Sequence, residues 1–163
     1  YFIGKIGQVL LTGLLQAAVL IAVAAFAFGV KLPSDPAAWL TFAWVFLLGV
    51  ATCAILGIGL SALPRSGKSA TAVIIPIVLV LQFISGVYLA FTNLPTWLQN
   101  VASAFPLKWL AQGMRSVFLP STLEAAEAGG SWNLPGVAIV LGIWLVAGLV
   151  MARLTFRWIR KDS

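Results

Sequence analysis

Residues 6–30 read IGQVLLTGLLQAAVLIAVAAFAFGV, an unbroken stretch without one charged side chain. A helix of roughly 20 apolar residues crosses the ~30 Å hydrocarbon layer of a bilayer, and lipid favours helices because it offers no partner to unpaired backbone groups. Three further stretches of this kind begin near residues 37, 70 and 136. We therefore expect four membrane-spanning helices, at about residues 6–30, 37–63, 70–91 and 136–158.

The overall composition agrees with a chain that is embedded in lipid. Of its 163 residues, 61% are hydrophobic and 9% are charged, whereas a soluble domain carries about 25% charged residues. A chain of this length has no water-soluble core large enough for so much apolar surface. We therefore predict a single all-α integral membrane domain over residues 1–163.

Residue types that carry enzyme chemistry are scarce. The chain has no histidine and one cysteine, Cys53, which excludes disulfides, Cys/His zinc sites and His-dependent catalysis. Residues 67–69, Gly-Lys-Ser, resemble the end of a phosphate-binding loop, but Ala62 stands where that motif requires glycine. All four acidic residues fall outside the expected spans: Asp35, Glu124, Glu127 and Asp162. We predict no catalytic, metal or cofactor site in this chain.

The basic residues follow the connections between the expected spans. The formal net charge is +6, but no basic stripe with interleaved aromatic residues is present, so we expect no nucleic-acid partner. In an alternating four-span topology, one side carries Lys31, Lys108 and Arg115. The opposite side carries Lys5, Arg65, Lys68, Arg153, Arg157, Arg160 and Lys161. By the positive-inside rule, the second side is cytoplasmic, and both ends of this chain lie there.

A pair of short amphipathic helices is expected at about residues 94–118, on the outer face. Apolar residues recur with helical spacing on both sides of Pro106, which interrupts the pattern. Lys108 and Arg115 fall away from the apolar face of the second helix. Each helix is too short to span, so the pattern predicts an interfacial or re-entrant hairpin. Residues 120–133 are expected to form a hydrated loop.

Two groups of residues recur at every fourth position within the spans. Gln8, Thr12 and Gln16 form a polar stripe along the first span, and Gln82 lies near the middle of the third. Such side chains avoid lipid, so they serve either as contacts between helices or as the lining of a translocation pathway. A ridge of small residues in the second span comprises Gly49, Cys53, Gly57 and Ser61. This ridge allows close helix packing, within the chain or against a second copy.

Several short motifs follow one another between residues 84 and 115. They are Ile84-Ser-Gly86, Leu94-Pro-Thr-Trp-Leu98, Pro106-Leu107 and Arg115. In this order they resemble the permease subunits of type-2 ABC transporters, whose third helix opens with a Gly-Lys pair similar to Gly4-Lys5. Those permeases are six-helix units. The resemblance therefore implies that this chain holds the last four helices of such a unit, without the first two helices and the coupling segment that follows them.

The resemblance implies the permease of an ATP-driven exporter in the bacterial inner membrane. The chain would form the translocation pathway with a second permease copy or paralogue, surrounded by membrane lipid. A separate cytoplasmic ABC ATPase would bind ATP and Mg²⁺, so no cofactor is expected in this chain. The candidate pathway residues are Gln8, Thr12, Gln16 and Gln82. The alternative is a non-catalytic membrane scaffold or assembly subunit, because the ridge and the hairpin also suit that role.

The predicted topology is tested by placing single cysteines in two connections. In a chain with Cys53 replaced, Ser66→Cys should react with an impermeant thiol reagent from the cytoplasmic side, and Ser121→Cys from the outer side. Labelling of both positions from the same side would contradict the span assignment.

Overall fold

The computed structural model describes residues 2–60 and 67–155, with the side chains of 4–60 and 71–154. Every regular element in these ranges is helical, which confirms the all-α prediction. The helices are α1 (Phe2–Phe28), α2 (Pro36–Leu60), α3 (Gly67–Ile84), α4 (Thr96–Ser103), α5 (Pro106–Phe118) and α6 (Leu134–Thr155). Two short 3-10 helices, η1 (Phe91–Asn93) and η2 (Ser121–Ala126), lie in the connections.

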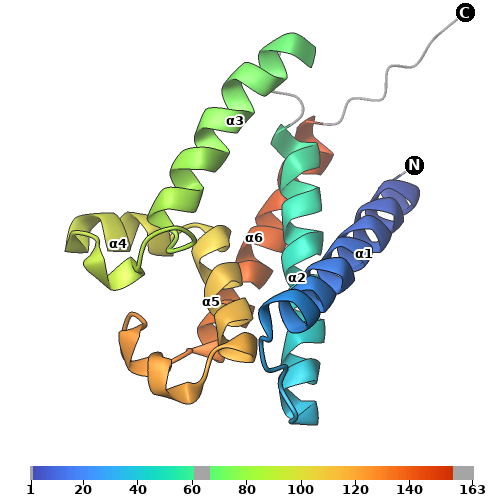
Figure 1. The fold of residues 1–163 in the computed structure, drawn as a ribbon. Coiled ribbons are helices and arrows are strands. Elements are labelled where there is room, and N and C mark those ends of the chain that lie inside the picture. The colour runs from blue at the N-terminus through green and yellow to red at the C-terminus, as the bar shows by residue number, and fades with distance from the viewer. Residues whose placement is uncertain (1, 61–66, 156–163) are drawn as a thin grey trace, which may run out of the picture.

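Three of these helices are long and apolar enough to cross a membrane. They are Gly4–Phe28 of α1, the whole of α2, and Leu134–Leu154 of α6, at the positions of three of the predicted spans. Residues 61–63 and 156–158 of those predictions lie outside the described residues. We call the end of the bundle where α2 and α6 begin the loop end, and the opposite end the terminal end (Figure 1).

α3 is shorter than predicted. Its apolar part is Thr71–Ile84, and the expected continuation of this span to about residue 91 is wrong. The helix stops because Gly86 takes a left-handed conformation, with φ of +79°, which ends a helix. The Ser85 hydroxyl donates to the Leu81 carbonyl at this end. Figure 1 shows α3 leaning away from α2 and α6, and its main contacts are with α4 and α5.

α2 and α6 form a parallel pair at the centre of the fold, since both helices begin at the loop end (Figure 1). A small residue permits their close approach, since Ile55 of α2 lies directly over Gly148 of α6. Thr52 is completely buried between the two helices. Its hydroxyl donates to the Leu141 carbonyl of α6 at 3.2 Å and to the Leu48 carbonyl of its own helix at 2.7 Å. The hydrophobic core beside this pair comprises Val45, Val137 and Leu141.

α5 packs antiparallel to the first half of α2. From the tip of the hairpin toward the loop end, the contacting pairs are Leu110 with Gly49, Gly113 with Val45, and Phe118 with Phe42. Gly113 also faces Val137 of α6. The helix therefore lies in the angle between α2 and α6, and glycine is the residue at its closest approach to both.

The tip of the α4–α5 hairpin lies at the level of the middle of α6. Trp144, half-way along α6, donates from Nε1 to the Ala104 carbonyl at 2.7 Å. Its ring also stacks on Phe105, with 6.1 Å between the ring centroids. The tip of the hairpin is therefore packed beside the middle of a helix that is long enough to cross a membrane. This position favours the re-entrant form of the prediction over the interfacial one, and we refer to the segment as the re-entrant hairpin.

α1 contacts α2 closely at one crossing point. Gly13 of α1 packs against Phe46 and Val50 of α2, and Figure 1 shows α1 leaning away from α2 toward its N-terminal end. Most described side chains of α1 are exposed in the isolated chain. Openings between α1 and α2 lie on both sides of this contact, one lined by Gln8 and Cys53 and the other by Ala22 and Trp39.

The packing of α5 against α2 and α6 is tested by adding one methyl group at Gly113. A β-carbon there would lie 2.8 Å from Val45 Cγ1 and 3.2 Å from Val137 Cγ1, closer than packed carbon atoms tolerate. Gly113→Ala is expected to lower the free energy of unfolding in detergent by about 1–3 kcal/mol, despite the higher helix propensity of alanine.

The matched control is Gly57→Ala, because no atom lies within 4 Å of a β-carbon built at Gly57. That variant should unfold at the wild-type temperature or slightly above it. Equal destabilisation by both substitutions would show that the close contact at Gly113 does not hold α5 against α2 and α6.

Candidate functional site

The opening between α1 and α2 toward the terminal end is a groove of about 540 Å³. One wall carries the predicted polar stripe of α1, Gln8, Thr12 and Gln16, with Lys5 nearest the terminal end. The other wall is formed by α2 and includes Cys53. The fold therefore brings three of the four predicted pathway residues together in one groove.

The polar stripe is exposed along this groove. Gln8, Thr12 and Gln16 are all exposed, and in the described part of the chain no hydrogen bond joins their side chains to another residue. An amide or hydroxyl that enters an apolar medium without a hydrogen bond costs about 2–7 kcal/mol. Within a membrane, these side chains would therefore need water, a polar solute or a polar side chain from another helix as a partner.

The predicted ridge of small residues is divided among different surroundings. Gly49 lies against Leu110 of the hairpin and also lines the groove, as does Cys53. Gly57 has no neighbour within 4 Å of a β-carbon position, and Ser61 lies outside the described residues. The ridge is therefore not a continuous contact surface within the described chain, and its packing against a second copy stays a prediction.

Gln82 lies apart from the groove. It is two residues from the end of α3, not near the middle of that helix as predicted, because α3 stops at Ile84. Its Oε1 accepts a hydrogen bond from the Tyr88 hydroxyl at 3.4 Å. α3 itself contacts the hairpin rather than α1. The structure thus separates Gln82 from the other three predicted pathway residues.

Lys108 is buried, contrary to the expectation that it lies away from the packed face of the hairpin. Its side chain is only 2% exposed. The ammonium lies 3.7 Å from the centroid of the Trp109 ring and 5.1 Å from that of Phe91. These aromatic faces attract the cation electrostatically. The helical pattern could not show this burial, because Phe91 comes from the connection after α3.

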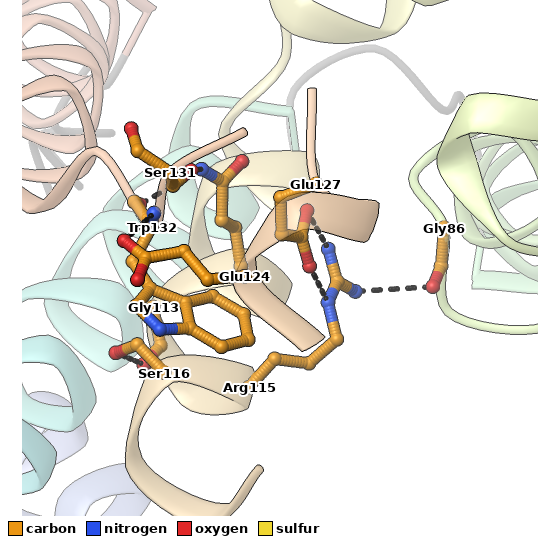
Figure 2. Close-up of polar contacts among 9 residues, drawn as sticks. Gly86, Gly113, Arg115, Ser116, Glu124, Glu127, Ser131 and Trp132 are labelled. Atoms are coloured by element: carbon orange, nitrogen blue, oxygen red, sulfur yellow. Dashed lines mark hydrogen bonds and ion pairs between the residues drawn. The ribbon is translucent and has the colours of Figure 1, made fainter. Parts of the chain in front are cut away.

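Arg115 forms the centre of a charged cluster at the loop end (Figure 2). Its Nε and Nη2 donate to the two carboxylate oxygens of Glu127, the second at 3.1 Å. Its Nη1 donates to the Gly86 carbonyl at 3.1 Å. The Arg115 side chain is 22% exposed and that of Glu127 is 7% exposed. One guanidinium therefore joins α5, the connection after η2 and the turn after α3.

The loop at residues 120–133 is ordered against α5, so the prediction of a hydrated loop is wrong for its buried part. Gln112 is completely buried, and its Nε2 donates to the Trp132 carbonyl at 2.8 Å and to the Ser131 carbonyl at 3.3 Å. Glu124 accepts a hydrogen bond from the Trp132 amide at 3.1 Å. One feature of the sequence could have indicated that the loop contacts α5, because Arg115 and Glu127 carry opposite charges.

The side chains at these two places can bind a polar molecule and hold chain segments together. No group of three His, Cys, Asp or Glu side chains gathers anywhere in the described residues. The groove offers amides, a hydroxyl and a cation to a bound molecule. The charged cluster holds separate segments together.

Comparison with known proteins identifies one family. The chain matches the family described as "ABC-2 family transporter protein" over residues 1–154. This match includes the groove, the re-entrant hairpin and the charged cluster. No curated protein and no solved structure shows a match.

The presence of water in the groove is tested by the reactivity of Cys53. A maleimide reacts with the thiolate, which forms in water and not in hydrocarbon. We expect Cys53 to react with a membrane-impermeant maleimide at least about tenfold faster than a cysteine placed at Ile143 of α6 in a Cys53→Ala background. Ile143 is 61% exposed on an apolar helix.

Replacing both stripe amides, in Gln8→Leu with Gln16→Leu, should slow the labelling of Cys53 because the groove loses its polar wall. Gln82→Leu is the matched control, since it removes an amide outside the groove and should leave the rate unchanged. Equal labelling of Cys53 and the cysteine at position 143 would contradict a hydrated groove.

Proposed function

The chain belongs to the ABC-2 family of transporter proteins, and we propose that it is the permease subunit of an ATP-driven exporter. Membership of the family, together with three helices able to cross a membrane, makes it a multi-pass membrane component of a transporter. The direction of transport, its energy source and its partners form the proposal. It would act in the bacterial inner membrane with a cytoplasmic ABC ATPase, which would bind ATP and Mg²⁺.

The observation that carries the proposal is the exposed polar stripe in the groove between α1 and α2. A stripe used only to join helices within this chain would face another helix of the chain. Gln8, Thr12 and Gln16 instead line a space large enough for a solute or several water molecules. We propose these three residues as pathway contacts. We leave Gln82 out because it lies beside Tyr88, on another helix.

The position of the hairpin supports alternating access to this groove. Leu110, near the tip of the hairpin, contributes to the groove wall beside Gly49. In the orientation expected from the positive-inside rule, Lys5 marks the cytoplasmic end. The groove then opens toward the cytoplasm, and the hairpin lies between its deep end and the outside. A movement of the hairpin would change access from the outer side.

A second permease copy or paralogue would complete the pathway. α1 and α3 expose large apolar side chains along most of their length, and lipid or another permease unit would cover them. The alternative function, a non-catalytic scaffold or assembly subunit, draws support from Gly57, whose open surroundings permit the close approach of a helix from another chain.

The proposed function is tested on the full-length protein co-expressed with candidate ABC ATPase subunits. The expected result is a stable complex that hydrolyses ATP. Trapping the ATPase with ATP and vanadate should lower the rate of Cys53 labelling from the cytoplasmic side at least about fivefold, because the groove closes on that side.

Gly57→Cys in a Cys53→Ala background is the control for this measurement. It lies on α2 outside the groove lining, so its labelling should not depend on the nucleotide. Failure to associate with any ATPase, or unchanged labelling of Cys53 in a trapped complex, would remove the exporter proposal and favour the scaffold.

A further inference from the structure

We infer that Arg115 is a positioning residue that couples the movement of α3 to the re-entrant hairpin. The claim that this coupling serves transport rests on the proposed function. The claim that Arg115 holds α3 to the hairpin rests on the contacts of its guanidinium with two segments outside its own helix. Arg115 belongs to α5, Glu127 follows η2, and Gly86 ends α3. No other ion pair links such distant segments in the residues that the structure describes.

α3 is held mainly at its loop end. None of its described side chains from Thr71 to Ile84 is buried, and the first buried residue after them is Ser85. Its main contacts are α4 and α5, and Figure 1 shows its other end standing apart from the bundle. A helix anchored in this way can tilt about its attached end. At about 27 Å long, a tilt of about 10° moves its free end by about 5 Å.

Besides its contacts with α4, this end of α3 is joined to α5 by two contacts on either side of a short exposed turn. Gly86 accepts the hydrogen bond from Arg115. Phe91, which is 4% exposed, packs against Gly86 and lies under the Lys108 ammonium. The residues between them, Val87 to Ala90, are exposed. Both contacts therefore lead to charged side chains of α5, and a tilt of α3 acts on the hairpin through them.

Glu127 makes the contact of Arg115 with Gly86 directional. A carboxylate that binds two N–H groups of one guanidinium fixes the plane of that group. The third donor, Nη1, then points at the Gly86 carbonyl (Figure 2). When α3 tilts, Gly86 either leaves this donor or draws α5 with it. Burial of Glu127 against α5 keeps the ion pair closed, so we infer that the hairpin follows α3.

The inference is tested by distances between spin labels in the full-length protein with Cys53→Ser. The first pair, Thr71→Cys and Leu149→Cys, reports the free end of α3 relative to α6. The second pair, Val101→Cys and Ile139→Cys, reports the hairpin relative to α6. With Arg115 present, vanadate trapping of the complex should shift both distances. In Arg115→Gln, the α3 distance distribution should broaden about twofold, and the hairpin distance should shift at most about half as far as in the wild type, because α3 keeps its contacts with α4.

Two further variants separate coupling from simple stabilisation of the loop. Glu127→Gln keeps Arg115 but removes the fork that orients it, and should weaken coupling in the same direction. Glu124→Gln is the matched control, because its amide oxygen can still accept from Trp132. The exchange of Arg115→Glu with Glu127→Arg should restore the thermal stability of the loop but not the coupling, since no guanidinium extends from α5 to Gly86.

The outcomes distinguish this inference from the proposed function. If Arg115→Gln leaves both distance distributions as in the wild type, or if the charge exchange restores the linked shift, the inference is overturned. If vanadate trapping changes neither distance in the wild type, the proposed ATP-driven cycle is contradicted. The width of the α3 distribution without nucleotide still decides whether Arg115 holds α3, and an unbroadened distribution in Arg115→Gln overturns the inference.

Discussion

The close packing of α2, α5 and α6 around Gly113 is the contact on which the arrangement of this chain depends. Lipid supplies little hydrophobic drive for helices to associate, so they adhere through dispersion contacts and hydrogen bonds at places where backbones come near one another. Gly148 admits Ile55 at the α2–α6 contact, and Gly113 admits Val45 and Val137 where α5 joins that pair. α5 can therefore enter the bundle, and the re-entrant hairpin follows from its position.

The hairpin connects the two features that the proposed function needs. Near its tip, Leu110 packs against Gly49 of α2 and lines the deep end of the polar groove. At its other end, Arg115 joins the ion pair with Glu127 and the end of α3. A displacement of α5 along its length would change both places together. The chain thus combines a closely packed pair, α2 and α6, with two helices, α1 and α3, that are held at few points.

Sequence reasoning succeeded where one element was sufficient to determine the outcome. The uncharged stretches located α1, α2 and α6, and Pro106 correctly marked the break between the two helices of the hairpin. It failed where distant segments meet. Lys108 was expected away from the apolar face of its helix but is buried beside Phe91, and Glu127 was expected in a hydrated loop but is buried and bound to Arg115 of α5. The length of α3 was overestimated because the residues after Gly86 are apolar yet not helical.

The amino-acid sequence by itself determined that this chain is embedded in lipid and how its residues are spaced along each helix. Hydropathy and helical period depend on near neighbours, so Gln8, Thr12 and Gln16 could be placed on one face of α1 without a structure. Only the tertiary structure decided what that face meets, and which segments Arg115 joins. Those contacts depend on the angle at which α1 crosses α2 and on the depth reached by the hairpin. Both are set by packing between residues far apart in the chain, such as Gly13 with Phe46 and Ala104 with Trp144.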